Sequence, residues 1–308
     1  MSGPTAAALD HRALFYDGHD ELAAAAAPLL RDGVERGDPA VAIVAGAGAD
    51  ALREELGAAT GEVEFRAADA FYDTPVRLLA RWAQELADYR GGGRLRVVSE
   101  VPFGRRSPAV LREWARADAI FSTAFPDAPL DMLCTYDASV LPDAVLEHAR
   151  ATHPGLVAGG ERVQNPDYGD PVAFLRALDA APLAPPPGVV HELRFDDEPA
   201  LVRRFAAERA RMAGLAGERL DDVRVAVTEI ATNAVLHGRA PRVIRAWVDG
   251  PSIVFEVEDA GEGIGSPLTG FLAPSVEATD GRGVWIARRL CDLVEVRGAR
   301  VRMHLALA

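Results

Sequence analysis

The chain has 308 residues, of which 49% are hydrophobic and 26% are charged, a composition typical of soluble globular proteins with two domains. Acidic residues outnumber basic ones 46 to 33, and the net charge of −13 argues against binding to nucleic acid or to an anionic membrane. No apolar run approaches the roughly 20 residues of a membrane span, and the chain does not open on a basic segment followed by an apolar one, so we expect a cytoplasmic protein.

The N-terminal half alternates between strand-like and helix-like segments. After a lead-in over residues 1–10, strands are predicted at 11–16, 40–45, 95–99 and 131–136. Helices are predicted at 20–35, from after the GAG at 46–48 to about residue 56, at 74–89 and at 108–124. Several of these strands are wholly apolar, which is typical of a parallel sheet covered by helices on both faces. The first domain is therefore expected to have an α/β fold.

The segment AGAGAD at 45–50 lies where a strand meets a helix, a place where parallel sheets often bind phosphate. A P-loop needs the pattern GxxxxGK[ST]. This segment has neither the lysine nor the hydroxyl, and Asp50 would repel phosphate. We therefore expect no ATP hydrolysis at this junction.

Short motifs in the same half resemble those of the MEDS sensory domain, a RecA-like fold that has lost its P-loop. The motifs are HRALFY at 11–16, EW at 113–114, LCTYD at 133–137, LP at 141–142 and ATHP at 151–154. The resemblance spans about residues 10–170. It implies a sensory domain that precedes an output module, but it does not imply which ligand is sensed.

Four polar residues of this domain are candidates for a sensory pocket: His11, Tyr16, Asp137 and His153. Each has a structural alternative. Asp137 can cap a turn, and His153, which precedes a proline, can end a helix. A metal site formed by His11 and His153 is a further alternative.

Two cysteines, Cys134 and Cys291, lie far apart in the sequence. Neither belongs to a CxxC motif or has a Cys/His cluster beside it in the chain. We therefore expect neither a disulfide nor a zinc site, and both thiols should pack as small buried apolar groups.

A proline-rich stretch marks the boundary between the two halves. Residues 159–171 are predicted to be irregular and residues 172–179 to form a short helix, and the sequence APLAPPPG then falls at 181–188. We expect a semi-extended linker over residues 180–190, which separates the domains without fixing their orientation.

The motif HELR at 191–194 imitates the phosphoacceptor box of a histidine kinase. That box should lie in a long helical hairpin, well upstream of the nucleotide site. Residues 189–195 instead alternate between apolar and polar in the manner of a strand. We therefore interpret them as the first strand of a second domain, over residues 191–308.

The second domain contains three pieces that together predict a nucleotide site. The first is an amphipathic helix starting near residue 217, on which Glu229 and Asn233 lie one turn apart. The second is Asp259, which follows predicted strands at 243–248 and 253–257 and opens the pattern DAGEG. The third is GRG at 281–283, which opens a helix over 284–291. A helix at 198–214 and strands at 293–296 and 301–307 complete the domain.

The residue types suit nucleotide chemistry. A carboxylate at a strand end, such as that of Asp259, can accept the exocyclic amine of adenine. Glycines permit close backbone approach, and free N–H groups at a helix N-terminus favour phosphate. The amide oxygen of Asn233 is a hard ligand for Mg²⁺ between phosphates, and Glu229 is placed to deprotonate an attacking hydroxyl or water.

These three pieces resemble the N, G1 and G2 boxes of the Bergerat ATP-binding fold, and EIATNAVLHG at 229–238 is most similar to the anti-sigma factor serine kinases. The resemblance implies an α/β sandwich that binds ATP and Mg²⁺, with Asn233 carrying the metal ion and Glu229 acting as the base that phosphorylates a Ser or Thr of an anti-sigma antagonist. The implied nucleotide-binding residues are Asn233, His237, Gly238, Asp259, Gly261, Gly263, Ile264, Gly281, Arg282 and Gly283.

One departure from the family pattern concerns adenine. The family places a Gly-Thr pair before the last strand, with the Thr supporting the adenine-reading Asp, whereas residues 297–300 read RGAR. Adenine is then held less well, or through water. Residues 266–280 are expected to form the lid, and Arg282 either touches the γ-phosphate or faces solvent.

Three functions remain open at this point. The first is an ATP-dependent anti-sigma factor and serine/threonine kinase, whose partner is a sigma factor or an anti-sigma antagonist. The second is a non-catalytic, nucleotide-dependent binding switch. The third is a histidine-kinase-like protein that uses His191. A homodimer is compatible with all three.

Overall fold

The structure is a computed structural model that describes residues 8–90, 92–104, 106–272, 274 and 282–307. The chain divides into two compact units, Met1–Asp73 with Arg81–Phe174, and Thr74–Ala80 with Leu175–Ala308. Each unit is described by itself below.

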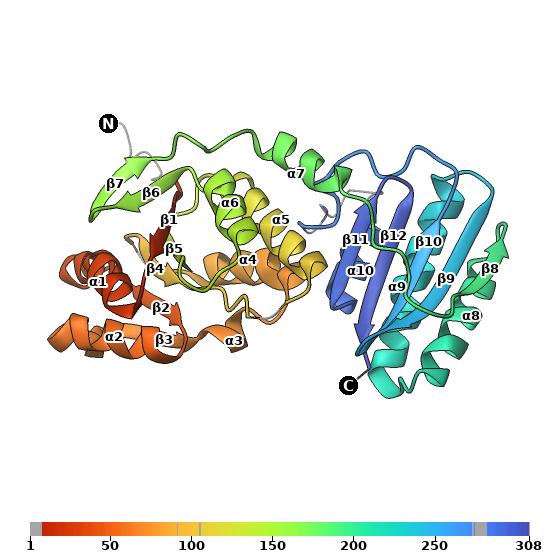
Figure 1. Cartoon of the computed structure of the whole chain (residues 1–308), viewed down its shortest axis with the longest axis horizontal. Coiled ribbons are helices and arrows are strands. Elements are labelled where there is room, and N and C mark those ends of the chain that lie inside the picture. The colour runs from red at the N-terminus through yellow and green to blue at the C-terminus, as the bar shows by residue number, and fades with distance from the viewer. Residues whose placement is uncertain (1–7, 91, 105, 273, 275–281, 308) are drawn as a thin grey trace. The chain divides into compact units, whose positions relative to one another are not determined.

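In the described part of the N-terminal unit, seven strands form one sheet in the order β3-β2-β4-β5-β1-β6-β7 (Figure 1). The strands are β1 Asp10–Tyr16, β2 Ala40–Val44, β3 Val63–Ala67, β4 Leu95–Ser99, β5 Leu130–Asp137, β6 Gly155–Ala158 and β7 Glu161–Gln164. Neighbouring strands are parallel except for β6 and β7. All five residues of β2 are buried, which explains its uninterrupted apolar sequence.

Helices cover both faces of this sheet. They are α1 His19–Arg36, α2 Gly46–Leu56, α3 Ala68–Phe71, α4 Leu78–Asp88, α5 Pro108–Ala124 and α6 Asp143–Thr152, with the 3-10 turn η1 Gly57–Glu62. A second 3-10 turn, η2 Pro75–Arg77, precedes α4 and falls within the residues of the C-terminal unit. On one face, Leu30 of α1 and Leu52 of α2 share a core cluster with Leu14 of β1. On the other face, Phe121 of α5 packs against the ring of His11 from β1, with ring centroids 5.0 Å apart.

Local chemistry sets the ends of two of these helices. At the start of α5, the Ser107 hydroxyl accepts a hydrogen bond from Val110 N at 3.4 Å, and Pro108 occupies the first helical position. At the end of α1, Gly37 adopts a left-handed conformation with φ 73°. Both boundaries lie within about a residue of the predicted ones.

The structure differs from the sequence-based expectation at several places before residue 171. The sequence predicts no element where β3, α3, α6 and β6 are found. The helix expected at 74–89 is divided, because Thr74 before Pro75 is extended, so a 3-10 turn precedes α4. The segment 159–171, expected to be irregular, contains β7. It pairs with β6 through Gly159 and Gly160, whose φ angles of 57° and 80° are those of a two-residue hairpin turn.

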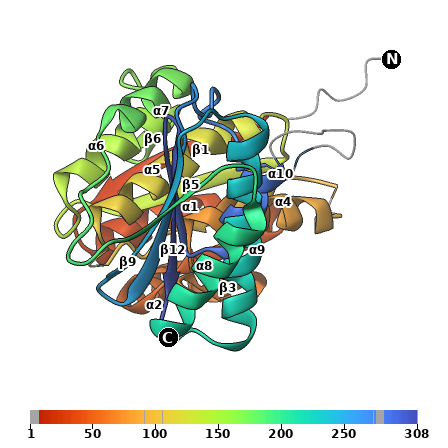
Figure 2. The same ribbon diagram turned by 90° about the vertical axis from the view of Figure 1, so that its right-hand side faces the viewer.

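The C-terminal unit contains an antiparallel sheet, and its described residues give the strand order β11-β12-β10-β9-β8. The strands are β8 His191–Phe195, β9 Arg242–Asp249, β10 Ser252–Glu258, β11 Leu293–Arg297 and β12 Arg300–Ala306, and the helices are α8 Pro199–Met212, α9 Gly217–Leu236 and α10 Arg282–Leu290. Helix α7, Pro171–Ala180, precedes the proline-rich stretch. In Figure 2, α8 and α9 lie together on one side of the sheet.

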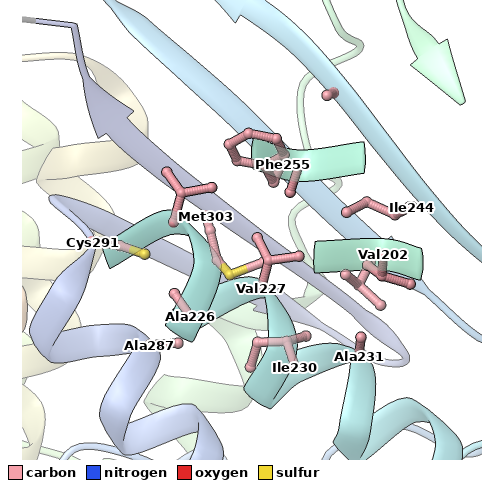
Figure 3. Close-up of a cluster of buried hydrophobic side chains, with 14 of the residues drawn as sticks. Val202, Ala226, Val227, Ile230, Ala231, Ile244, Phe255, Ala287, Cys291 and Met303 are labelled. Atoms are coloured by element: carbon pink, nitrogen blue, oxygen red, sulfur yellow. The ribbon is translucent and has the colours of Figure 1, made fainter. Parts of the chain in front are cut away.

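A core cluster joins these helices to one face of the sheet (Figure 3). Val202 of α8 and Val227 of α9 are fully buried there, as are Phe255 of β10 and Met303 of β12. In β9, Ile244 and Ala246 belong to this cluster and lie two residues apart, so they face the same side of the sheet. The helices therefore hold β10 and the start of its following loop against α9.

The first part of the proline-rich stretch is bound to the sheet of the C-terminal unit. Arg297 donates to the carbonyl of Ala181 at 3.0 Å and pairs with Asp179 at 3.1 Å. Arg302 donates to the carbonyl of Ala184 at 2.9 Å. This part of the stretch is thus fastened to β11 and β12.

The fold class expected from the sequence is confirmed. A mostly parallel sheet forms the N-terminal unit, and an antiparallel sheet with helices forms the C-terminal one. The predicted C-terminal elements lie within about two residues of those observed. Among the described residues, none of the helices combines the length and the apolarity needed to cross a membrane.

Candidate nucleotide-binding site

A cavity of about 500 Å³ lies between α9, the loop after β10 and the turn between β11 and β12. Its volume is in the range of small-molecule sites. Six of the predicted nucleotide-binding residues line it: Asn233, His237, Gly238, Asp259, Gly263 and Ile264. Segments far apart in the sequence thus meet at one cavity.

Asp259, at the end of β10, is held in a fixed orientation. Its Oδ1 accepts hydrogen bonds from Gly261 N at 2.6 Å and from Arg239 N at 3.3 Å. None of the described residues bonds to its Oδ2. One carboxylate oxygen is therefore used to position the side chain, and the other can accept a hydrogen bond from a ligand, such as the amine of adenine.

Two glycines make room for this carboxylate. A Cβ on Gly238 would lie 2.5 Å from both Cγ and Oδ1 of Asp259, and a Cβ on Gly261 would lie 2.7 Å from Oδ1. These distances are well below the roughly 3.5–4.0 Å of ordinary van der Waals contact. Gly238 and Gly261 are therefore required by the neighbouring aspartate, and not only by a bound nucleotide.

Gly263 lies against the turn between β11 and β12. Its φ of 81° favours glycine, and a Cβ there would overlap the carbonyl group of Gly298. Two backbone hydrogen bonds join the same segments, from Ile264 N to Gly298 O at 3.2 Å and from Asp259 N to Ala299 O at 3.3 Å. The loop that follows β10 is thus fastened to this turn.

Ala299 occupies the position at which the family pattern has a threonine. Its backbone carbonyl supports Asp259 through the amide, but it offers no hydroxyl to the cavity. A hydroxyl residue that sequence reasoning missed, Thr269, does line the cavity. It belongs to the expected lid, of which the structure describes residues 266–272 and 274. The sequence offered no signal for it beyond its position in that segment.

Asn233 forms part of the cavity wall next to the start of α10. A Cβ on Gly283 would lie 2.7 Å from Asn233 Nδ2, so this glycine allows α10 to approach the amide closely. Arg282, the first residue of α10, is exposed. Gly281 lies outside the described residues.

Glu229 does not line the cavity that contains Asn233. It lies one turn earlier on α9, half-buried, in a separate open hollow that it shares with Arg203 of α8 and with Arg224 and Thr228. The structure thus places the predicted base beside the nucleotide cavity and not inside it.

In the N-terminal unit, Tyr16 and Asp137 lie at the carboxyl ends of two paired strands. Tyr16 donates to Glu100 Oε1 at 2.9 Å, and Glu100 Oε2 accepts from Ala45 N at 3.4 Å. The backbone amide at the start of the AGAGAD junction is thus bonded to a carboxylate. Asp137 Oδ1 accepts from Ser139 N at 2.9 Å and from its hydroxyl at 2.6 Å, so this side chain stabilises a turn.

His11 and His153 lie apart from those two residues and against each other, with ring centroids 4.1 Å apart. Burial lowers the pKa of both imidazoles below the usual value, and for His11 the neighbouring His153 adds to this shift. His153 follows the last residue of α6 and is extended, as expected for a residue before proline.

The two cysteines have different surroundings. Cys291 packs as an apolar group in the core of the C-terminal unit. Cys134, in contrast, has its Sγ 3.5 Å from His11 Nε2. Burial raises the pKa of both thiols, and the nearby Asp118 carboxyl adds to the shift of Cys134. Cys134 thus belongs to a Cys/His cluster that sequence spacing does not reveal.

Two protein-family models match parts of this chain. Residues 10–154 match MEDS, the methanogen/methylotroph, DcmR sensory domain, and residues 196–307 match the histidine kinase-like ATPase domain. A search of curated proteins found no match. The chain therefore carries an N-terminal MEDS domain and a C-terminal histidine kinase-like ATPase domain. A sensory domain joined to a kinase-like ATPase domain is an arrangement for ATP-dependent signalling, and the ATPase domain implies the use of ATP.

Proposed function

We propose that this protein, a MEDS domain joined to a histidine kinase-like ATPase domain, is an ATP-dependent anti-sigma regulatory factor. In this proposal it phosphorylates a Ser or Thr of an anti-sigma antagonist, and the MEDS domain gates that activity. The observation that carries the proposal is the single cavity where Asn233, Asp259 and Gly263 meet. The resemblance of EIATNAVLHG at 229–238 to anti-sigma kinases supports the choice among kinase-like functions.

The cavity residues fit a magnesium nucleotide. Asp259 presents one carboxylate oxygen for the adenine amine, and the backbone amides of Gly261 and Arg239 hold that carboxylate in place. Asn233 would hold Mg²⁺ through its amide oxygen, and the ion would balance the charge of the phosphates. Val284, in the first turn of α10, also lines the cavity, so the N–H groups at this helix N-terminus would be available to a phosphate.

The transfer step assigns one role to Glu229. Its carboxylate takes the proton of the partner's hydroxyl as that oxygen forms a bond to the γ-phosphorus, and the bond from the γ-phosphorus to the leaving β-phosphate oxygen breaks. The open hollow of Glu229, next to the cavity, is where a side chain from another protein can reach it. The net charge of −13 favours a partner with a basic surface, such as a region of a sigma factor.

The position of Glu229 also supports a second candidate function. Because this carboxylate does not line the cavity, a nucleotide-dependent binding switch without catalysis is consistent with the same geometry. A histidine-kinase role has less support, because His191 lies in β8 at the edge of the sheet and its Nδ1 is 3.4 Å from Arg209.

The first experiment is calorimetric titration of ATP and ADP, with Mg²⁺, into the full chain. Asp259→Asn should abolish binding, because an amide that presents its NH₂ cannot accept the adenine amine. Asp249→Asn, at the exposed end of β9, serves as the matched control and should bind as the wild type does. Absence of ATP binding by the wild type would sink both ATP-dependent functions.

The second experiment separates the kinase from the switch. Proteins captured on the chain are incubated with it and γ-labelled ATP, and acid-stable label on a captured protein is measured. Glu229→Ala should keep ATP binding and lose transfer, whereas Glu218→Ala, exposed in the first turn of the same helix, should retain both. Nucleotide-dependent capture without transfer by the wild type would establish the switch, and acid-labile label on the chain itself would indicate a histidine kinase.

A further inference from the structure

A cluster of three metal-ligating side chains is buried in the MEDS domain. His11 comes from β1, Cys134 from β5, and His153 from the residue after α6. Cys134 pairs in register with Ala13, so His11, two residues earlier on β1, faces the same side of the sheet. His11 is 3% exposed, His153 0% and Cys134 8%.

The spacing of the three ligand atoms suits one ion. One ring nitrogen of His11, one of His153 and Cys134 Sγ all lie within 4.8 Å of one another. His11 Nε2 is 3.5 Å from Cys134 Sγ. A nitrogen and a sulfur that bind the same tetrahedral zinc ion at ordinary bond lengths are separated by about 3.6 Å. Only small side-chain movements would therefore close the site.

Both imidazoles are oriented as metal ligands are. His153 Nδ1 donates to the carbonyl of Ala149 at 2.8 Å, and His11 Nδ1 is 2.9 Å from the Ser122 hydroxyl. A carbonyl only accepts, so the proton of His153 is on Nδ1 and a lone pair is on Nε2. That buried Nε2 has no hydrogen-bond partner among the described residues. Buried polar atoms are seldom left unpaired, whereas a metal ligand is expected to have its lone pair available.

We propose that His11, Cys134 and His153 bind one thiophilic transition-metal ion, Zn²⁺ or Cu⁺, through the two Nε2 atoms and the Sγ thiolate. The proposal concerns the MEDS domain alone and does not depend on the function proposed for the ATPase domain. It gives the sensory domain a defined inorganic ligand.

The charge of the site distinguishes the two ions. Two neutral imidazoles and one thiolate carry a charge of −1, which Cu⁺ neutralises, whereas Zn²⁺ leaves a net positive charge in a buried place. The carboxylate of Asp118, which accepts from Tyr136 at 2.8 Å, is close enough to influence both His153 and Cys134. Asp118→Asn should therefore weaken Zn²⁺ binding and leave Cu⁺ binding unchanged.

The experiment uses the full chain, reduced and metal-free. Co²⁺ is titrated as a spectroscopic substitute for zinc, and Zn²⁺ and, without oxygen, Cu⁺ are then tested as competitors. We expect one thiolate-to-cobalt charge-transfer band that saturates at one ion per chain and is displaced by Zn²⁺ or Cu⁺. Cobalt bound at an oxygen-ligand magnesium site gives no such band, so the two kinds of site are separated.

Matched variants assign the ligands. Cys134→Ser should lose the band, and Cys291→Ser should keep it. Because Cys291→Ser leaves Cys134 as the only thiol, this variant tests the site even where Cys134→Ser fails to fold. Ser122→Ala removes the hydrogen-bond partner of His11 and should lower the affinity for the metal ion about 10–100-fold. Thr123→Ala, on the exposed side of α5, should leave that affinity unchanged. No band in either the wild type or Cys291→Ser, or a band that persists in Cys134→Ser, would overturn the proposal.

Discussion

Replacing Gly263 by alanine tests how the loop after β10 is held against the turn between β11 and β12. Gly263 has a φ of 81°, at which an alanine costs about 1–2 kcal/mol. The added Cβ would also overlap the Gly298 carbonyl and lie 2.5 Å from Ala299 N, about 1 Å short of ordinary contact. The loop and the turn must therefore move apart.

That movement breaks the two hydrogen bonds that join these segments, from Ile264 N to Gly298 O and from Asp259 N to Ala299 O. Each contributes about 0.5–1.5 kcal/mol net. With the backbone strain, the total is about 2–5 kcal/mol. If the loop detaches without unfolding the domain, this free energy is lost from ATP binding instead of from folding. A loss of about 2 kcal/mol corresponds to roughly a 30-fold weaker affinity for ATP.

Urea unfolding and ATP calorimetry measure the two outcomes on the same protein. Gly250→Ala is the matched control, because Gly250 has a φ of 55° and no atom within 4 Å of the added Cβ. It should show the backbone strain alone, with ATP affinity unchanged. If Gly263→Ala is as stable as Gly250→Ala and binds ATP like the wild type, the account of this loop is wrong.

Two further predictions concern buried charges. Arg302 pairs with the buried carboxylate of Glu256 at 2.7 Å. Arg302→Met leaves that carboxylate with fewer partners, so it should lower the free energy of unfolding, measured by urea titration, by about 3 kcal/mol. Arg300→Met on the same strand, where the arginine side chain is 49% exposed, should cost below about 1 kcal/mol, and equal losses would contradict the reasoning. Burial raises the folded-state pKa of Asp118 above its unfolded value, so its ionisation destabilises the fold as the pH rises through the raised pKa. Asp118→Asn should therefore raise the melting temperature at pH 7 but not below about pH 4, as thermal melts at several pH values would show. Asp127→Asn, at an exposed position, should leave the melting temperature unchanged at both pH values.

Much of the nucleotide cavity is predictable because its residues are marked by local patterns. The helical period over 217–236 places Glu229 and Asn233 one turn apart whatever surrounds the helix. An acid followed by glycines after a strand similarly predicts a carboxylate at a strand end, where Asp259 is found. Such patterns depend on neighbours in the chain, so they can be interpreted before any tertiary contact is known.

The spatial relations between these residues are not predictable in the same way. The sequence shows that Gly263 follows Asp259, but not that it abuts Gly298. Residue spacing puts Glu229 next to Asn233, but the packing of α8 against α9 gives the glutamate a separate hollow. Which cavity a side chain faces depends on the surface that a different element supplies.

The MEDS domain shows the limit most clearly. Its alternation of strands and helices is apparent from the period and length of the apolar runs, so the α/β fold class follows from the chain alone. The order of strands in the sheet, however, brings β1 beside β5, and only that order puts His11 against Cys134, 123 residues later. Bringing together residues so far apart in the chain costs conformational entropy, which the packing of the whole sheet offsets. No local sequence pattern indicates that contact. The sequence by itself determined the elements, the fold class and the residue types available for chemistry, whereas the tertiary structure decided which of those residues meet.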